Sequence, residues 1–134
     1  MNFEKFTQKS RAALADAQRL AAENGNFAVE PVHLFLSLVS DAEGLVPEIL
    51  ASASADAKAV RADAALAVGA LPKLGGSGYN AEALHASGEL SALLEAADRE
   101  REGMGDAFLS VEHLLLAFLG EKKGKVAEDR KSVV

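Results

Sequence analysis

The chain has 134 residues, of which 49% are hydrophobic and 25% charged, a composition typical of one soluble globular domain. It contains no cysteine, which excludes disulfides, thiolate metal sites and cysteine nucleophiles, and its formal net charge of −6 argues against a nucleic-acid partner. No apolar run reaches the roughly 18 residues that a membrane span needs, and no apolar secretory segment opens the chain. We therefore expect a cytoplasmic protein without a membrane partner.

The composition favours helices throughout the chain. Alanine occurs 27 times and leucine 19 times, whereas there are ten valines, one isoleucine and one threonine. Alanine and leucine are strong helix formers, and β-branched residues favour strands. The sequence therefore predicts an all-α fold.

Capping signals bound the first two predicted helices. Thr7 is placed to cap a helix that ends at Asn24-Gly25, because glycine takes the left-handed C-cap conformation without strain. Glu30-Pro31 begins the second helix, since proline suits the first helical position. We expect the second helix to be buried on most sides. The inner positions follow helical spacing and are Ala13, Leu14, Ala17, Leu20 and Ala21, then Val32, Phe35, Leu36 and Val39.

Two more helices and a linker follow. A short helix is predicted over residues 46–50, and an alanine-rich helix over about 55–68. The inner side of the longer helix comprises Val60, Ala64 and Ala67. A proline and three glycines then break the pattern, so we interpret residues 71–79 as a linker.

Beyond the linker the helical pattern restarts. Residues 80–85 are expected to form a turn or two, and Ser87 to cap a helix that ends at Gly103 and Gly105. Ser110 is expected to cap the last helix. The apolar stripes are Leu90, Leu93, Leu94 and Ala97 in the first of these helices and Leu114, Leu115, Phe118 and Leu119 in the second.

An internal repeat relates the two halves of the chain. Residues 6–39 align without a gap on residues 86–119. Caps, terminating glycines and histidines coincide as the pairs Thr7/Ser87, Gly25/Gly105 and His33/His113. Each unit is too small to bury its apolar face alone. We therefore expect two helical repeats, about 6–70 and 80–120, to pack as a pseudo-twofold pseudodimer with a groove along the seam, and the isolated chain to be a monomer.

No motif indicates nucleotide chemistry or catalysis. The string from Gly120 to Val126 has the wrong spacing for a phosphate-binding loop. His33 and His113 lack companions at metal-ligand spacing, so we interpret both as structural residues that bond nearby backbone. A small enzyme that uses His33 with Glu30 is the weaker alternative. We expect no enzyme activity, no catalytic or metal-binding residue and no cofactor.

The charged and polar residues of the second half have ordinary explanations. The charge run from Glu95 to Glu102 is interpreted as a solvated helix face. Asp106 alone would be a turn residue, and Glu112 a first-turn carboxylate stabilised by the helix dipole.

Several motifs resemble one known family. The strings FTQK at residues 6–9 and ALADAQ at 13–18 are similar to the start of the Clp N-terminal domain. EPVHL at residues 30–34 resembles that family's E-P-x-H-L signature, and FLSVEHLL at 108–115 resembles the matching segment of its second repeat. The Leu71-Pro72-Lys73 linker points to the ClpB subgroup, the AAA+ protein disaggregases.

The resemblance covers residues 1–120. The charged tail, residues 121–134, departs from it. We interpret this tail either as the truncated end of the second unit or as a short helix of divergent sequence.

The resemblance implies a substrate-recognition module of a ClpB-type, ATP-dependent disaggregase chaperone. Such a domain binds unfolded or aggregated polypeptides in an apolar groove and passes them to ATPase rings that are not in this chain, in a parent that forms a hexameric ring. The family's polar substrate-handling positions match Thr7, Asp106 and Glu112. Leu93 and Leu94 are candidates for the apolar groove by position, with core packing as the alternative. The other function that the resemblance allows is adaptor-protein docking of the ClpA or ClpC kind.

Overall fold

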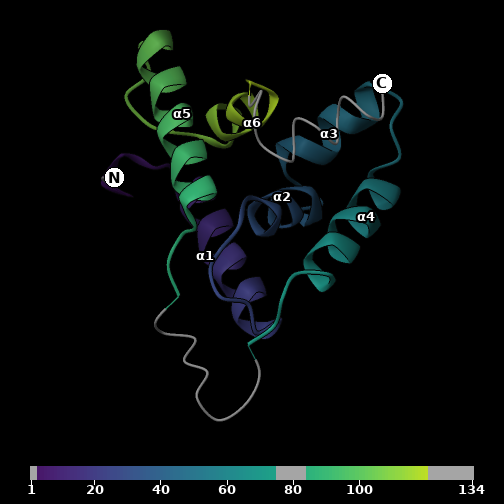
Figure 1. Cartoon of the computed structure of the whole chain (residues 1–134). Helices are drawn as coiled ribbons and strands as arrows, with labels where there is room; N and C mark the ends of the chain where they lie inside the picture. Colours follow the sequence, from purple (N-terminus) through teal and green to yellow (C-terminus); the bar gives the residue numbers. More distant parts are fainter. Residues whose placement is uncertain (1–2, 75–83, 121–134) are drawn as a thin grey trace.

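The computed structural model describes residues 3–74 and 84–120, which are helical with short connections (Figure 1). The all-α prediction is therefore confirmed for these residues. The predictions for residues 75–79 of the linker, for residues 80–83 and for the tail, 121–134, lie outside the described residues. The elements in chain order are η1 (Phe3–Lys5), α1 (Gln8–Glu23), α2 (Pro31–Ser40), α3 (Leu45–Ser52), α4 (Ala57–Gly69), α5 (Gly88–Met104) and α6 (Val111–Gly120).

The helix α2 lies at the centre of the arrangement. It packs against α1, α3, α4 and α5, and α5 packs in turn against α6 (Figure 1). The expectation that this helix is buried on most sides is confirmed, because six of its ten residues are buried. Such a central helix can be apolar nearly all round, since each face meets another helix.

Equivalent caps begin and end the first helix of each repeat. The Thr7 hydroxyl oxygen accepts a hydrogen bond from the Ser10 N–H at 3.2 Å, and the Ser87 hydroxyl oxygen accepts one from the Leu90 N–H at 3.1 Å. Gly25 and Gly105 follow the two helices with φ of +67° and +72°, the left-handed region that glycine adopts without strain. Both pairs of predicted signals are confirmed.

The segment before α1 pairs with the segment before α6. Phe6 and Leu109 form an isolated parallel β-bridge. The Thr7 N–H donates to the Leu109 carbonyl at 2.9 Å, and the Leu109 N–H donates to the Lys5 carbonyl at 2.7 Å. The start of the first repeat is thereby attached to the middle of the second.

A second bridge repeats this pairing with the two halves exchanged. Val29, before α2, pairs in parallel with Ala86, before α5. The Ser87 N–H donates to the Val29 carbonyl at 2.9 Å, and the Val29 N–H donates to the His85 carbonyl at 3.0 Å. In the repeat alignment each residue of one bridge corresponds to a residue of the other. Two exchanged bridges are what a twofold relation requires of an interface, so the predicted pseudo-twofold packing is confirmed.

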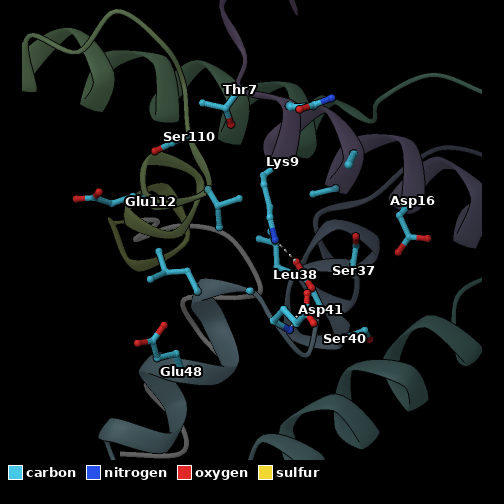
Figure 2. A pocket seen from close by; sticks show the side chains of 17 residues that line it. Thr7, Lys9, Asp16, Ser37, Leu38, Ser40, Asp41, Glu48, Ser110 and Glu112 are labelled. Carbon is cyan, nitrogen blue, oxygen red and sulfur yellow. Dashed lines mark hydrogen bonds and ion pairs between the residues drawn. The ribbon is translucent and has the colours of Figure 1, made fainter.

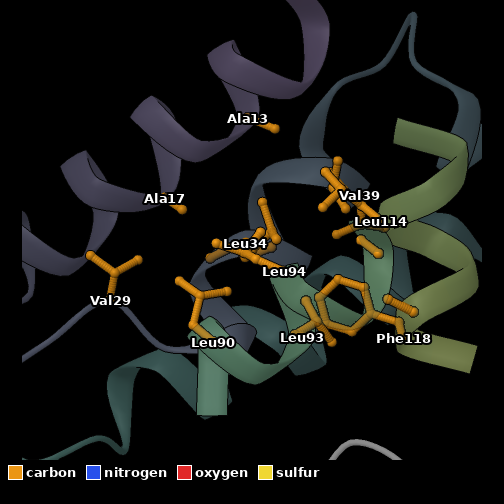
Figure 3. Close-up of a cluster of buried hydrophobic side chains, with 14 of the residues drawn as sticks. Ala13, Ala17, Val29, Leu34, Val39, Leu90, Leu93, Leu94, Leu114 and Phe118 are labelled. Atoms are coloured by element: carbon orange, nitrogen blue, oxygen red, sulfur yellow. The ribbon is translucent and has the colours of Figure 1, made fainter. Parts of the chain in front are cut away.

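The core lies between the two repeats (Figure 3). Both repeats supply side chains that are fully buried, and these include Leu34, Leu90, Leu93, Leu109 and Leu114. Alanines of α1 let the neighbouring helices approach closely: Ala17 and Ala21 have no exposed surface. One core therefore serves both units.

Three inner positions differ from the sequence prediction. Ala67 is exposed and Val68 is buried in its place, because the α4 stripe follows an i, i+4, i+8 spacing from Val60. Leu119 is 56% exposed at the end of α6. Arg101 is 7% exposed, although the charge run that contains it was interpreted as solvated.

Candidate functional site

A groove of about 1020 Å³ lies between the two repeats on one side of the seam (Figure 2). Its walls are the first turns of α1, the end of α2, the beginning of α3 and the first turn of α6. Small and apolar side chains line its interior: Ala12, Ala13, Leu38, Leu45 and Val111. We call this cavity the α1–α6 groove.

Carboxylates surround the α1–α6 groove. They are Asp16, Asp41, Glu43, Glu48 and Glu112. Lys9 is the one basic residue among the lining residues, and its Nζ lies 3.4 Å from Asp41 Oδ2. An apolar interior with an acidic rim can bury apolar side chains and attract basic ones.

Two predicted site residues, Thr7 and Glu112, line this groove together. Thr7 is half-buried at the start of α1, where its hydroxyl also lies 2.9 Å from the Ser10 hydroxyl. Glu112 is exposed in the first turn of α6, where the helix dipole favours a carboxylate. The bridge between Phe6 and Leu109 brings these helix starts together, although the two residues lie far apart in the sequence.

The third polar residue, Asp106, lies outside the groove lining. It belongs to the loop between α5 and α6, and its carboxylate oxygen Oδ2 accepts a hydrogen bond from His113 Nε2 at 2.8 Å. Its side chain is 47% exposed, so a ligand can still reach it. In this structure its contacts are those of a positioning residue for the histidine.

The two histidines make the same backbone bond in each repeat. Nδ1 of His33 accepts from the Glu30 N–H at 2.8 Å, and Nδ1 of His113 accepts from the Ser110 N–H at 2.9 Å. Both rings are buried at the start of the second helix of their repeat. The prediction that they bond nearby backbone is confirmed.

The hydrogen-bond partner of the other ring nitrogen, Nε2, differs between the two repeats. With Nδ1 accepting, the hydrogen-bond network assigns the ring proton to Nε2. Nε2 donates to Asn26 Oδ1 in the first repeat and to Asp106 Oδ2 in the second, at 2.8 Å in both. Asn26 and Asp106 occupy equivalent places in the repeat alignment. Over residues 3–74 and 84–120, no group of three histidine or carboxylate side chains is placed to hold a metal ion.

Burial of His33 predicts a pH dependence of stability. Desolvation lowers the pKa of His33, against a smaller opposing effect of the Glu30 charge. In the unfolded chain the ring titrates near its ordinary pKa of about 6.5, so below that pH the unfolded state binds more protons. We expect the His33 ring to have no effect on the free energy of unfolding above about pH 7. As the pH drops through 6.5, the free energy of unfolding should decrease.

The measurement is an NMR titration of the His33 ring in the folded chain, beside urea unfolding at each pH. The expected midpoint lies below 6.5. A midpoint at or above that value would contradict the burial argument. His85→Gln is the control, because His85 is exposed, and this substitution should leave the His33 titration unchanged.

Leu93 and Leu94 do not line the groove. They are 2% and 5% exposed and belong to the shared core (Figure 3). Neither leucine is among the residues that line the groove, and both pack within the shared core. The structure therefore favours core packing, the alternative interpretation, for both leucines.

Arg101 was missed by the sequence analysis. Its Nε donates to Asp98 Oδ1 at 2.8 Å, and its Nη1 donates to the Asp106 carbonyl at 2.9 Å. The Arg101 hydrogen bond lowers the pKa of Asp98. The guanidinium thus joins the end of α5 to the loop that carries Asp106, and the only sequence signal was an arginine three residues after an aspartate.

Comparison with known proteins identifies the family of the chain. The family model for the Clp repeat (R) N-terminal domain matches residues 5–132 of the sequence. The chain belongs to the Clp N-terminal domain family. This confirms the family identified from the motifs, and the match extends past residue 120 into the tail.

Relatives of this Clp N-terminal domain include ClpB chaperones. The chain is 35% identical over 122 residues to chaperone protein ClpB of a Bacillus cereus strain. The aligned region covers 91% of this chain and 14% of that protein. It is 37% identical over 134 residues to ClpB of Propionibacterium freudenreichii subsp. shermanii, with 100% and 15% covered. Its fold is similar to the Hsp104 N-terminal domain from Candida albicans, with a TM-score of 0.83, 16% identity, and 96% of this chain and 81% of that chain covered.

The chain is thus a Clp N-terminal domain that is similar in sequence to ClpB chaperones and in fold to the Hsp104 N-terminal domain. The family model that it matches describes an N-terminal repeat domain and not an ATPase module. It spans about 14–15% of the length of the two ClpB relatives described above. Across the part of the chain that the structure describes, no helix is both long enough and apolar enough to cross a membrane.

Proposed function

We propose that this Clp N-terminal domain binds unfolded or aggregated polypeptide segments in the α1–α6 groove. The observation that carries the proposal is the joint position of Thr7 and Glu112 on the wall of a groove with an apolar interior and an acidic rim. Apolar burial attracts segments without demanding a particular sequence. Glu112 and the other rim carboxylates orient the segment and favour basic flanking residues. We also propose that the bound segment contacts the exposed Asp106 side chain outside the groove, in the loop that leads into α6.

The proposed site is weak and acts in multiple copies. An unfolded segment loses conformational entropy when it binds, so its affinity for one groove is low. In a parent chaperone with a hexameric ring, several such domains would hold one client by avidity and pass it to the ATPase rings. The proposed location of that parent is the cytoplasm. The isolated domain is proposed to be a monomer, because its repeats already cover each other.

The direct test is an NMR titration of this chain with a permanently unfolded basic protein, lysozyme that has been reduced and alkylated with iodoacetamide. We expect amide shifts to cluster at Thr7, Glu112 and the groove interior. An absence of shifts at high ligand concentration would overturn the proposal. Shifts confined to an outer face would favour docking of a folded adaptor protein instead.

A charge variant with a matched control tests the rim. Glu112→Gln keeps the shape of the side chain and removes its charge. An exposed charge pair contributes about 0.2–1 kcal/mol, so the affinity for the basic unfolded protein should fall by a factor of about 1.4 to 5. Glu89→Gln is the control, since Glu89 is also an exposed first-turn carboxylate, on α5, and lies outside the groove lining. Equal losses in both variants would point to general charge attraction.

A further inference from the structure

We propose that Lys9 occupies the place of a client's basic side chain, and that a lysine or arginine of the bound polypeptide displaces Lys9 from Asp41. This inference rests on the proposed function of the α1–α6 groove. It assigns the Asp41 carboxylate as the group that binds the client's basic residue. Lys9 of the domain itself competes with that residue for Asp41.

The ion pair lies across the groove. Lys9 comes from the first turn of α1, and Asp41 follows the last residue of α2. The Nζ–Oδ2 distance is 3.4 Å, and both residues line the groove (Figure 2). The side chains are 64% and 46% exposed, so solvent and a ligand can reach both groups. An exposed ion pair of this kind stabilises a fold very little, and its exchange for another pair costs correspondingly little.

The helix dipoles oppose both partners of the pair. The dipole disfavours a cation at the start of a helix and an anion at its end. Lys9 is a cation at the start of α1, and Asp41 is an anion at the end of α2. A counter-ion therefore stabilises each of these charges. When Lys9 moves away, Asp41 still requires another cation to offset the unfavourable helix dipole.

Asp41 is oriented more firmly than Lys9. Its Oδ1 accepts a hydrogen bond from the Glu43 N–H at 3.3 Å. Its carboxylate also lies against Gly44, where an added Cβ would be only 2.8 Å from Oδ2. Glycine at this position therefore makes room for the carboxylate. The Asp41 carboxylate is held in place by the turn before α3, whereas the lysine is held only by its flexible stem.

The charge balance of the groove selects the occupant. Five carboxylates line it against one amine, and that amine is paired with Asp41. A segment that brings its own lysine or arginine replaces the charge of Lys9, and an arginine adds a second hydrogen bond to the carboxylate. A segment without a basic residue leaves Lys9 in place. Lys9 and Asp41 thus act as specificity-determining residues for basic, otherwise apolar segments.

The test compares two extended apolar peptides that differ only in carrying two lysines or two glutamines. Lys9→Met should raise the affinity for the lysine peptide about three- to tenfold and change that for the glutamine peptide less than twofold. Asp41→Asn should lower the affinity for the lysine peptide by a similar factor and abolish the gain from Lys9→Met in the double variant. Lys58→Met, at an exposed lysine of α4 outside the groove lining, makes the same change in net charge and should do neither.

The outcomes separate the two proposals. If both peptides bind the unaltered chain but Lys9→Met does not raise the affinity for the lysine peptide, the proposed displacement of Lys9 is wrong. The proposal that the groove binds polypeptides is then unaffected. Equal gains for both peptides would make Lys9 a steric obstacle and would also overturn the exchange. If neither peptide binds the unaltered chain, and the unfolded protein does not bind it either, the proposed function and this inference fall together.

Discussion

Replacing Ala12 with tryptophan is expected to weaken the binding of an unfolded polypeptide by at least about tenfold, or 1.4 kcal/mol. Ala12 is exposed and lines the interior of the α1–α6 groove. The indole is the largest side chain and would occupy space that a client side chain needs. Because the residue is exposed, the substitution should leave the core and the free energy of unfolding nearly unchanged.

The repeat supplies the control for this variant. Ala92 is the counterpart of Ala12 in the repeat alignment, is exposed on α5, and does not line the groove. Ala92→Trp should keep the affinity of the unaltered chain. The sequence contains no tryptophan, so with a client that also lacks tryptophan the fluorescence of each variant reports its own site alone. Client binding that survives in Ala12→Trp, or is lost equally in both variants, would contradict the groove as the binding site.

Local signals explain why much of the fold was predictable. Thr7, Ser87, Gly25 and Gly105 each act through backbone within a few residues, so their roles can be read from neighbouring positions. The repeat then supplied long-range information without an alignment of other proteins. Two related units must meet through related surfaces, which is how the pseudo-twofold packing could be expected.

The groove could not be predicted in the same way. Lys9 and Asp41 are 32 residues apart, and nothing in either local sequence indicates that they meet. Arg101 sits in a run of charges, yet it is buried and donates a hydrogen bond to the loop that follows its helix. These features depend on how helices pack, whereas sequence periodicity gives only which face of each helix is apolar.

The two roles considered for Leu93, groove residue and core residue, can be compared through the repeat. Its counterpart in the first repeat is Ala13, and Ala13 lines the groove. Leu93 is 2% exposed and, like Ala13, belongs to the buried core, but it does not line the groove. Positions related by the repeat can therefore differ in whether they line the groove, as the equal-sized pair Ala12 and Ala92 also does. Pattern alone identified Leu93 as apolar and inward, which describes a core residue and a groove residue equally well.

Leu93→Ala should distinguish these two roles by a large loss of stability. Truncating a fully buried leucine leaves a cavity and costs about 2–5 kcal/mol, a considerable part of the roughly 5–15 kcal/mol that holds a typical domain folded. Leu66→Ala is the control, because Leu66 is 73% exposed on α4, and its change should stay within about 0.5 kcal/mol. Urea unfolding measures both variants, and client titration at low denaturant follows the molecules that remain folded. Those molecules should bind with unaltered affinity, because the groove wall is formed by other residues. A Leu93→Ala chain of normal stability that no longer binds clients would instead place this side chain in the binding surface.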